Sequence, residues 1–291
     1  MSTGDFGAII TAMVTPFDAS GRVDEVAGVR LVHHLLDNGS DGVLVCGTTG
    51  ETATLTDDEQ LAFIGLILGE VRAAHPGATV IAGVGSNNTR HAVELTERVS
   101  ALRPDALLSV NPYYNRPSRR GIVEHFRAID RSTDLPIVLY NIPQRTCADM
   151  SNDLLAELAQ MEHVVAVKQA NAANLAHIDG LALYAGNDDL LAKVLDMGEP
   201  GGILTASHAF GNEMRRLVTD PEHRAEIDAG LADVYRDMAI APGACSCKAA
   251  LNLLGLDVGL PRLPYVPLDE QETRVIRELL QRHGLLMGTG S

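Results

Sequence analysis

Residues 42–83 read GVLVCGTTGETATLTDDEQLAFIGLILGEVRAAHPGATVIAG, with an apolar run at each end and a helical pattern between them. The runs at 42–46 and 79–83 do not alternate polar and apolar residues, which is typical of parallel strands covered on both faces. Thr56 is a candidate N-cap with Glu59 at the capping-box position. Pro76 should end the helix near His75. This stretch therefore predicts one strand–helix–strand unit.

The same unit recurs along the chain. Eight runs are candidate strands: residues 8–13, 42–46, 79–83, 106–110, 137–140, 164–168, 181–185 and 201–204. Most intervals carry an amphipathic helical pattern, at residues 24–38, 56–75, 89–101, 121–132, 152–161 and 188–197. Eight such units predict an α/β fold, a (β/α)8 TIM barrel.

After about residue 222 the strand pattern ceases. Helical segments at 222–238, 243–254 and 269–283 follow, separated by Pro242 and by a proline-containing stretch. We expect a catalytic barrel of residues 1–221 and a C-terminal helical extension of residues 222–291.

The composition narrows the class of protein. The 291 residues carry 23 basic and 38 acidic side chains, a net charge of −15, which disfavours a nucleic-acid partner. No apolar stretch approaches the roughly 20 residues of a membrane span, and the N-terminal stretch does not resemble a signal peptide. Four cysteines in a chain of this length are expected to be reduced thiols. We expect a soluble cytoplasmic protein without a membrane partner.

In an α/β barrel the active site lies at the carboxyl ends of the strands. Hydroxyl and amide side chains dominate those positions, with one amine among them: Thr15, Thr48, Thr49, Ser86, Asn87, Asn111, Tyr113, Tyr114, Tyr140, Asn141, Lys168, Asn187, Asp188, Thr205 and Ser207. Clustered histidine and carboxylate ligands are lacking there, so a mechanism without metal is expected.

The amine is Lys168, one of only three lysines beside 20 arginines. It ends a buried strand, where desolvation should lower its pKa toward the range of a neutral nucleophile. The alternative is a salt bridge to a carboxylate such as Asp188. Lys193 and Lys248 fall in helical segments and are expected to be solvated.

Other positions admit two interpretations each. Tyr140 ends the preceding strand and could move protons to and from a Lys168 adduct, or complete the core. The GTTGE segment, residues 47–51, could offer hydroxyls and backbone N–H groups to a small carboxylate. The NPYYNRP loop, residues 111–117, could be a lid, a subunit contact or a rigid turn.

Taken together, GTTGE, NPYYNRP, YNIPQRT at residues 140–146 and VVAVKQA at 164–170 resemble the pyruvate-dependent class I aldolase and lyase superfamily. The paired tyrosines and the arginine after YNIP narrow the resemblance to the dihydrodipicolinate synthase family. It extends from the AMVTPF segment, residues 12–17, to the PRLP stretch, residues 261–264.

The resemblance implies a role for eight residues. Lys168 would form a Schiff base with pyruvate, Tyr140 would donate and accept protons, and Thr48 and Tyr114 would complete the relay, with Tyr114 reaching into a neighbouring subunit. The substrate-binding residues would be Thr49 and Ile203 for pyruvate, Gly186 at the mouth and Arg145 for the carboxylate of the aldehyde.

The resemblance also implies a reaction and an assembly. Pyruvate would condense with L-aspartate 4-semialdehyde to 4-hydroxy-tetrahydrodipicolinate in lysine and diaminopimelate biosynthesis, without a metal or an organic cofactor. A homodimer or homotetramer is expected.

The sequence departs from the family pattern at two places. Cys147 stands where a glycine usually follows the Arg-Thr pair. At the family's lysine-feedback site Asn87 and Tyr113 fit, but His91 replaces an acidic residue, and Asp57 and Gln60 replace histidines of sensitive members. Weak or absent lysine feedback is therefore expected.

Two alternatives remain open from the sequence. One is another pyruvate-dependent lyase or aldolase that acts on a sugar acid or a hydroxy-oxo acid. The presence of Arg145 disfavours this alternative. The other is a non-catalytic barrel that binds a small molecule, which has no need for an amine and three hydroxyls at one mouth.

Overall fold

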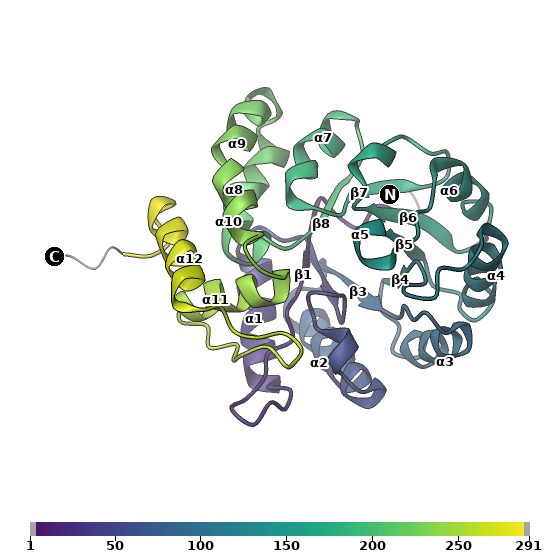
Figure 1. The fold of residues 1–291 in the computed structure, drawn as a ribbon, viewed down its shortest axis with the longest axis horizontal. Coiled ribbons are helices and arrows are strands. Elements are labelled where there is room, and N and C mark those ends of the chain that lie inside the picture. The colour runs from purple at the N-terminus through teal and green to yellow at the C-terminus, as the bar shows by residue number, and fades with distance from the viewer. Residues whose placement is uncertain (1–3, 288–291) are drawn as a thin grey trace.

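The computed structural model describes residues 4–287, which form a closed barrel of eight parallel strands (Figure 1). Each strand pairs with its neighbours in sequence, and β8 pairs with β1 to close the barrel. The strands are β1 Ile9–Ala12, β2 Gly42–Val45, β3 Thr79–Gly83, β4 Ala106–Val110, β5 Ile137–Asn141, β6 Val164–Gln169, β7 Ala182–Ala185 and β8 Gly201–Leu204. The predicted (β/α)8 TIM barrel is confirmed, and all eight predicted strands are present.

The helices cover the outside of the barrel. They are α1 Glu25–Asp37, α2 Asp57–Ala74, α3 Thr89–Ser100, α4 Arg119–Asp130, α5 Pro143–Thr146, α6 Asn152–Leu158, α7 Leu191–Asp196, α8 Ser207–Thr219, α9 Arg224–Gly230, α10 Ala232–Met238, α11 Gly243–Leu253 and α12 Glu270–Arg282. The Thr56 hydroxyl accepts from the Glu59 N–H, and the Glu59 carboxylate accepts from the Thr56 N–H, so the capping box that begins α2 is confirmed.

The helices match the sequence prediction only in part. The link between β6 and β7, where no helix was predicted, contains only the short 3-10 helix Ala172–Asn174. Helices α5 and α8 were not predicted. The segment predicted as one helix over 222–238 is divided, since Leu231 has φ −97° and ψ 2°, outside helical geometry.

Buried side chains form two layers. One fills the inside of the barrel with alternate strand residues, among them Ile10, Leu44, Ile81 and Tyr184. The other lies between the strands and the surrounding helices. Alternation along each strand places one residue in each layer in turn.

The C-terminal helices lie together on one side of the barrel, where α11 contacts α8 and α12 packs against α10 and α11 (Figure 1). The division into residues 1–221 and 222–291 stays a prediction. Across residues 4–287, no helix is both long and apolar enough to cross a membrane.

Candidate active site

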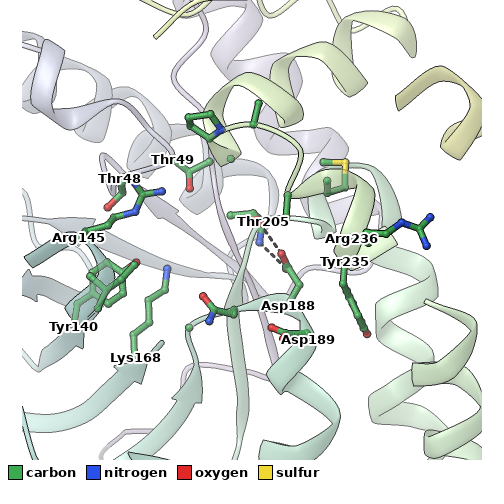
Figure 2. A pocket seen from close by; sticks show the side chains of 18 residues that line it. Thr48, Thr49, Tyr140, Arg145, Lys168, Asp188, Asp189, Thr205, Tyr235 and Arg236 are labelled. Carbon is green, nitrogen blue, oxygen red and sulfur yellow. Dashed lines mark hydrogen bonds between the residues drawn. The ribbon is translucent and has the colours of Figure 1, made fainter. Parts of the chain in front are cut away.

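A cavity of about 530 Å³ opens at the carboxyl ends of the strands (Figure 2). Its walls come from β5, β6, the loops after β2, β7 and β8, and the segment from α10 to the start of α11. The lining residues are Thr48, Thr49, Tyr140, Ile142, Arg145, Lys168, Gly186, Asn187, Asp188, Asp189, Thr205, Tyr235, Arg236, Met238, Ala239, Ala241, Pro242 and Gly243.

Lys168 lies beside Tyr140 because of an irregularity in strand pairing. Ile137 pairs with Val164, but Val138 pairs with Ala166, so β6 carries one extra residue there. This bulge brings Lys168 opposite Tyr140 and turns the Lys168 side chain to the same inner face of the barrel, since a one-residue slip exchanges the faces of a strand. The Lys168 Nζ atom lies 4.6 Å from the centroid of the Tyr140 ring.

The environment of Lys168 increases the neutral fraction of its amine. The residue is 5% exposed. Burial lowers the pKa of Lys168 to about 8, with Arg145 adding to the effect and the Asp188 charge opposing it. The Asp188 carboxylate is engaged elsewhere: it accepts from the Thr205 N–H at 2.9 Å, the Thr205 hydroxyl at 2.6 Å and the Ala206 N–H at 3.0 Å. The burial of Lys168 and the hydrogen bonds that engage Asp188 favour a role of Lys168 as an amine nucleophile over a role in a simple salt bridge.

Tyr140 is held as a protonated phenol. Burial raises the pKa of Tyr140 to about 12, while the Arg145 charge and a hydrogen bond with the Thr48 side chain act in the opposite direction. At neutral pH the phenol can therefore donate a proton to an atom beside Lys168. Figure 2 shows Thr48 and Arg145 on the same side of the cavity, above Tyr140 and Lys168 in this view.

The GTTGE loop after β2 presents Thr48 and Thr49 to the cavity. The residue that leads into the loop packs closely on the next strand, since a Cβ atom at Gly83 would lie 2.1 Å from the Cys46 carbonyl oxygen. Gly50 is fixed through its carbonyl oxygen, which accepts from the Thr15 hydroxyl at 2.6 Å. Rigid attachment of this kind can hold hydroxyl groups in a defined position.

The burial of Lys248 differs from the sequence prediction. It was expected to be solvated, yet it is 1% exposed and its Nζ atom lies 2.7 Å from the Glu51 carboxylate. The expectation was wrong because α11 packs against the GTTGE loop, and its helical pattern alone does not reveal that contact.

Arg145 and Gly186 border the mouth of the cavity. Arg145 is exposed on the short helix α5, so its guanidinium is free to meet an incoming anion. Gly186 must be glycine, because a Cβ atom there would lie 2.8 Å from the backbone of Gln169. Cys147 has φ 55°, a left-handed conformation that favours glycine, and it lines a separate cavity with Arg116 and Arg119.

Two of the eight predicted catalytic and substrate-binding residues do not line this cavity. Ile203 is fully buried on β8, inside the barrel. Tyr114 is 88% exposed and has φ 72°. The structure of one chain therefore does not join Tyr114 to Lys168 and Tyr140.

The residues of the predicted feedback site lie together on another part of the surface. The Asn87 amide donates to the Tyr113 carbonyl oxygen at 3.1 Å. The His91 ring lies between Ser86, 3.1 Å from Nδ1, and Asp57, 3.0 Å from Nε2. His91 and Asp57 thus pair with each other.

Sequence reasoning missed several lining residues, among them Asp189, Tyr235, Arg236 and Gly243. The last three come from the C-terminal helices, and their sequences carry no local motif. Among residues 4–287, no three His, Cys, Asp or Glu side chains are grouped so that they could hold a metal ion.

A closed (β/α)8 barrel with a buried lysine beside a buried tyrosine at the carboxyl ends of its strands is the architecture of lyases that act through a lysine imine. The chain belongs to the dihydrodipicolinate synthetase family, whose model matches residues 5–283.

Three relatives illustrate the similarity. The chain is 41% identical over 283 residues to 4-hydroxy-tetrahydrodipicolinate synthase 1 of Halalkalibacterium halodurans, which covers 93% of this chain and 95% of the relative. The crystal structure of a dihydrodipicolinate synthase from Bacillus anthracis matches with a TM-score of 0.90 and 38% identity, over 96% of this chain and 98% of the other. The enzyme from Cyanidioschyzon merolae with lysine bound matches with a TM-score of 0.91 and 37% identity, over 97% and 99%.

Proposed function

We propose that this protein is a 4-hydroxy-tetrahydrodipicolinate synthase, a lyase that condenses pyruvate with L-aspartate 4-semialdehyde in lysine and diaminopimelate biosynthesis. The observation that carries the proposal is the buried Lys168 amine beside the Tyr140 phenol, in a cavity bordered by Arg145. Membership of the dihydrodipicolinate synthetase family supports the choice of substrates.

The reaction begins at Lys168. Its neutral amine attacks the ketone carbon of pyruvate, and loss of water leaves a protonated imine. The imine draws electrons from the methyl group, so that a proton leaves and an enamine forms. Tyr140 and Thr48 would carry these protons, because both face Lys168 in the cavity.

The enamine carbon then attacks the aldehyde carbon of the second substrate, and the new alkoxide takes a proton from the relay. The amino group of that substrate attacks the imine carbon and displaces the Lys168 amine, which closes the ring and frees the enzyme. These steps call for neither a metal nor an organic cofactor.

The remaining site residues would bind the substrates. Thr49 would hold the pyruvate carboxylate by its hydroxyl, and Arg145 would hold the carboxylate of the aldehyde by a bidentate contact. Gly186 would leave room at the mouth, while Ile203, buried below the cavity, would contribute through its backbone.

The choice of aldehyde can be tested by steady-state kinetics with purified protein and pyruvate. Aspartate 4-semialdehyde should give a kcat/KM at least about 10²-fold above that of sugar-derived aldehydes, since Arg145 has no partner on a neutral sugar aldehyde. A preference for a sugar-derived aldehyde would instead support the alternative lyase.

Tyr114 is proposed to act in the site of a neighbouring subunit of a homodimer or homotetramer, which agrees with its 88% exposure in one chain. Mixing a Lys168→Ala chain with a Tyr114→Phe chain tests this. If Tyr114 acts across the interface, mixed assemblies contain one intact site and regain activity. If it acts within its own chain, no activity returns.

We place the enzyme in the cytoplasm, consistent with four free thiols. We also propose that Asn87, His91 and Tyr113 form a lysine site of reduced affinity. The pairing of His91 with Asp57 supports this, because the Asp57 carboxylate is then already engaged and is a poorer partner for an ammonium group.

A further inference from the structure

A fully buried ion pair lies outside the catalytic cavity. Lys248 on α11 is 1% exposed, Glu51 at the end of the GTTGE loop is 1% exposed, and the Lys248 Nζ atom lies 2.7 Å from the Glu51 carboxylate. Burying two charges is expensive unless each is well partnered. The mechanism above uses neither residue, so the pair needs another explanation.

Both members of the pair are tied to the segment after α11. The Lys248 ammonium donates to the Leu260 carbonyl oxygen at 3.2 Å and lies 4.0 Å from the centroid of the Phe17 ring. The other Glu51 oxygen accepts from the Arg262 N–H at 2.8 Å. The Arg262 guanidinium in turn donates to the Thr54 carbonyl oxygen, also at 2.8 Å. The loop is thus held by the C-terminal extension.

Glu51 is connected directly to the residues that face Lys168. Its N–H donates to the Thr48 carbonyl oxygen at 3.1 Å, and its φ of 57° shows a left-handed turn. A residue with a side chain rarely adopts this conformation unless its surroundings impose it. The start of α11 also touches the loop, since a Cβ atom at Gly243 would lie 3.9 Å from the Thr49 hydroxyl.

We infer that Lys248 is a positioning residue for the reaction: through Glu51 it fixes the GTTGE loop so that the Thr48 and Thr49 hydroxyls face pyruvate on Lys168. The inference rests on the proposed function. Lys248 does not line the cavity and touches no reacting atom, so its effect passes through the loop.

The expected effect is confined to one substrate. Without Lys248 the Glu51 carboxylate is buried without its cationic partner, and the turn that it anchors can relax toward solvent. Displacement of the loop weakens the hold on pyruvate. Arg145 lies on α5, which these contacts do not reach, so binding of the aldehyde should be unaffected.

The test is Lys248→Met, which keeps about the length of the side chain and removes its charge, with Lys193→Met as the matched control because Lys193 is exposed on α7. In Lys248→Met we expect the KM for pyruvate to rise about tenfold or more, while the KM for the aldehyde stays within about twofold. Lys193→Met should match the wild type in both constants.

Glu51→Gln tests the same link from its other end, and it decides the outcome if Lys248→Met does not fold. An unchanged KM for pyruvate, with or without a lower melting temperature, would overturn the inference, because a purely structural role lowers the active fraction and not the affinity. Failure of both variants to fold would overturn it as well. If wild-type protein traps no pyruvate on Lys168, the proposed function itself fails, whereas normal trapping with an unchanged KM refutes only the role of Lys248.

Discussion

The ionisation of Lys168 should control the pH dependence of imine formation. Burial lowers its pKa from 10.5 to about 8. At pH 7 about 9% of the amine is then neutral, against about 0.03% for an ordinary lysine, a gain of about 300-fold in the nucleophile. The rate of imine formation with saturating pyruvate should therefore rise with pH and reach half its maximum near pH 8.

Two variants test the cause of this shift, because they change the pKa in opposite directions. The Asp188 charge raises the pKa of Lys168, so Asp188→Asn should move the half-rise to lower pH. The Arg145 charge lowers it, so Arg145→Met should move the half-rise to higher pH.

The assay is rapid mixing with pyruvate followed by borohydride reduction at timed intervals, with intact-mass detection between pH 6 and 10. Circular dichroism at each pH serves as the control for folding. A half-rise above pH 10 in the wild type would contradict the lowered pKa of Lys168. Shifts of the same sign in the two variants would contradict the opposite effects of Asp188 and Arg145 on that pKa.

Three further predictions concern other residues. Tyr140→Phe should still form the pyruvate imine but lose about 10²-fold in turnover, and wild-type turnover in this variant would exclude the proton relay. Burial lowers the pKa of His208 to about 4, and its Nε2 accepts from the Val14 N–H at 3.0 Å. The unfolded state therefore binds more protons between pH 6.5 and 4, so the free energy of unfolding should fall by up to about 3 kcal/mol as the pH drops through this range. In urea titrations the free energy of unfolding of His208→Gln should depend less on pH than that of the wild type. An equal pH dependence in the two proteins would contradict this role of His208. Finally, millimolar lysine should leave the initial rate nearly unchanged, because His91 and Asp57 pair with each other, and a halved rate would contradict this.

The barrel could be predicted from the sequence because its strands are covered on both faces. Runs such as residues 164–167 are apolar throughout, and this local property can be recognised in the sequence without knowledge of the fold. Lys168 could be singled out for the same reason, as a charged residue at the end of such a run. The bulge that brings it opposite Tyr140 could not be predicted, since strand register depends on both partners.

Contacts between segments far apart in the sequence could not be predicted from local sequence patterns. Lys248 was expected to be solvated because the sequence of its helix does not reveal the contact with Glu51, which lies far away in the sequence. Tyr235 and Gly243 were missed as lining residues for a similar reason, because they lie in the C-terminal extension, which folds back over the barrel mouth. A helical period identifies a buried face but not the partner that covers it.

Imine formation at Lys168 is tested most directly by borohydride reduction of the wild-type protein in the presence of pyruvate. Intact-mass analysis and peptide mapping follow, with Lys168→Ala as the control. We expect one pyruvate-derived adduct per chain, located on Lys168 and absent from the variant. No adduct, or an adduct on Lys193 or Lys248, would contradict this expectation.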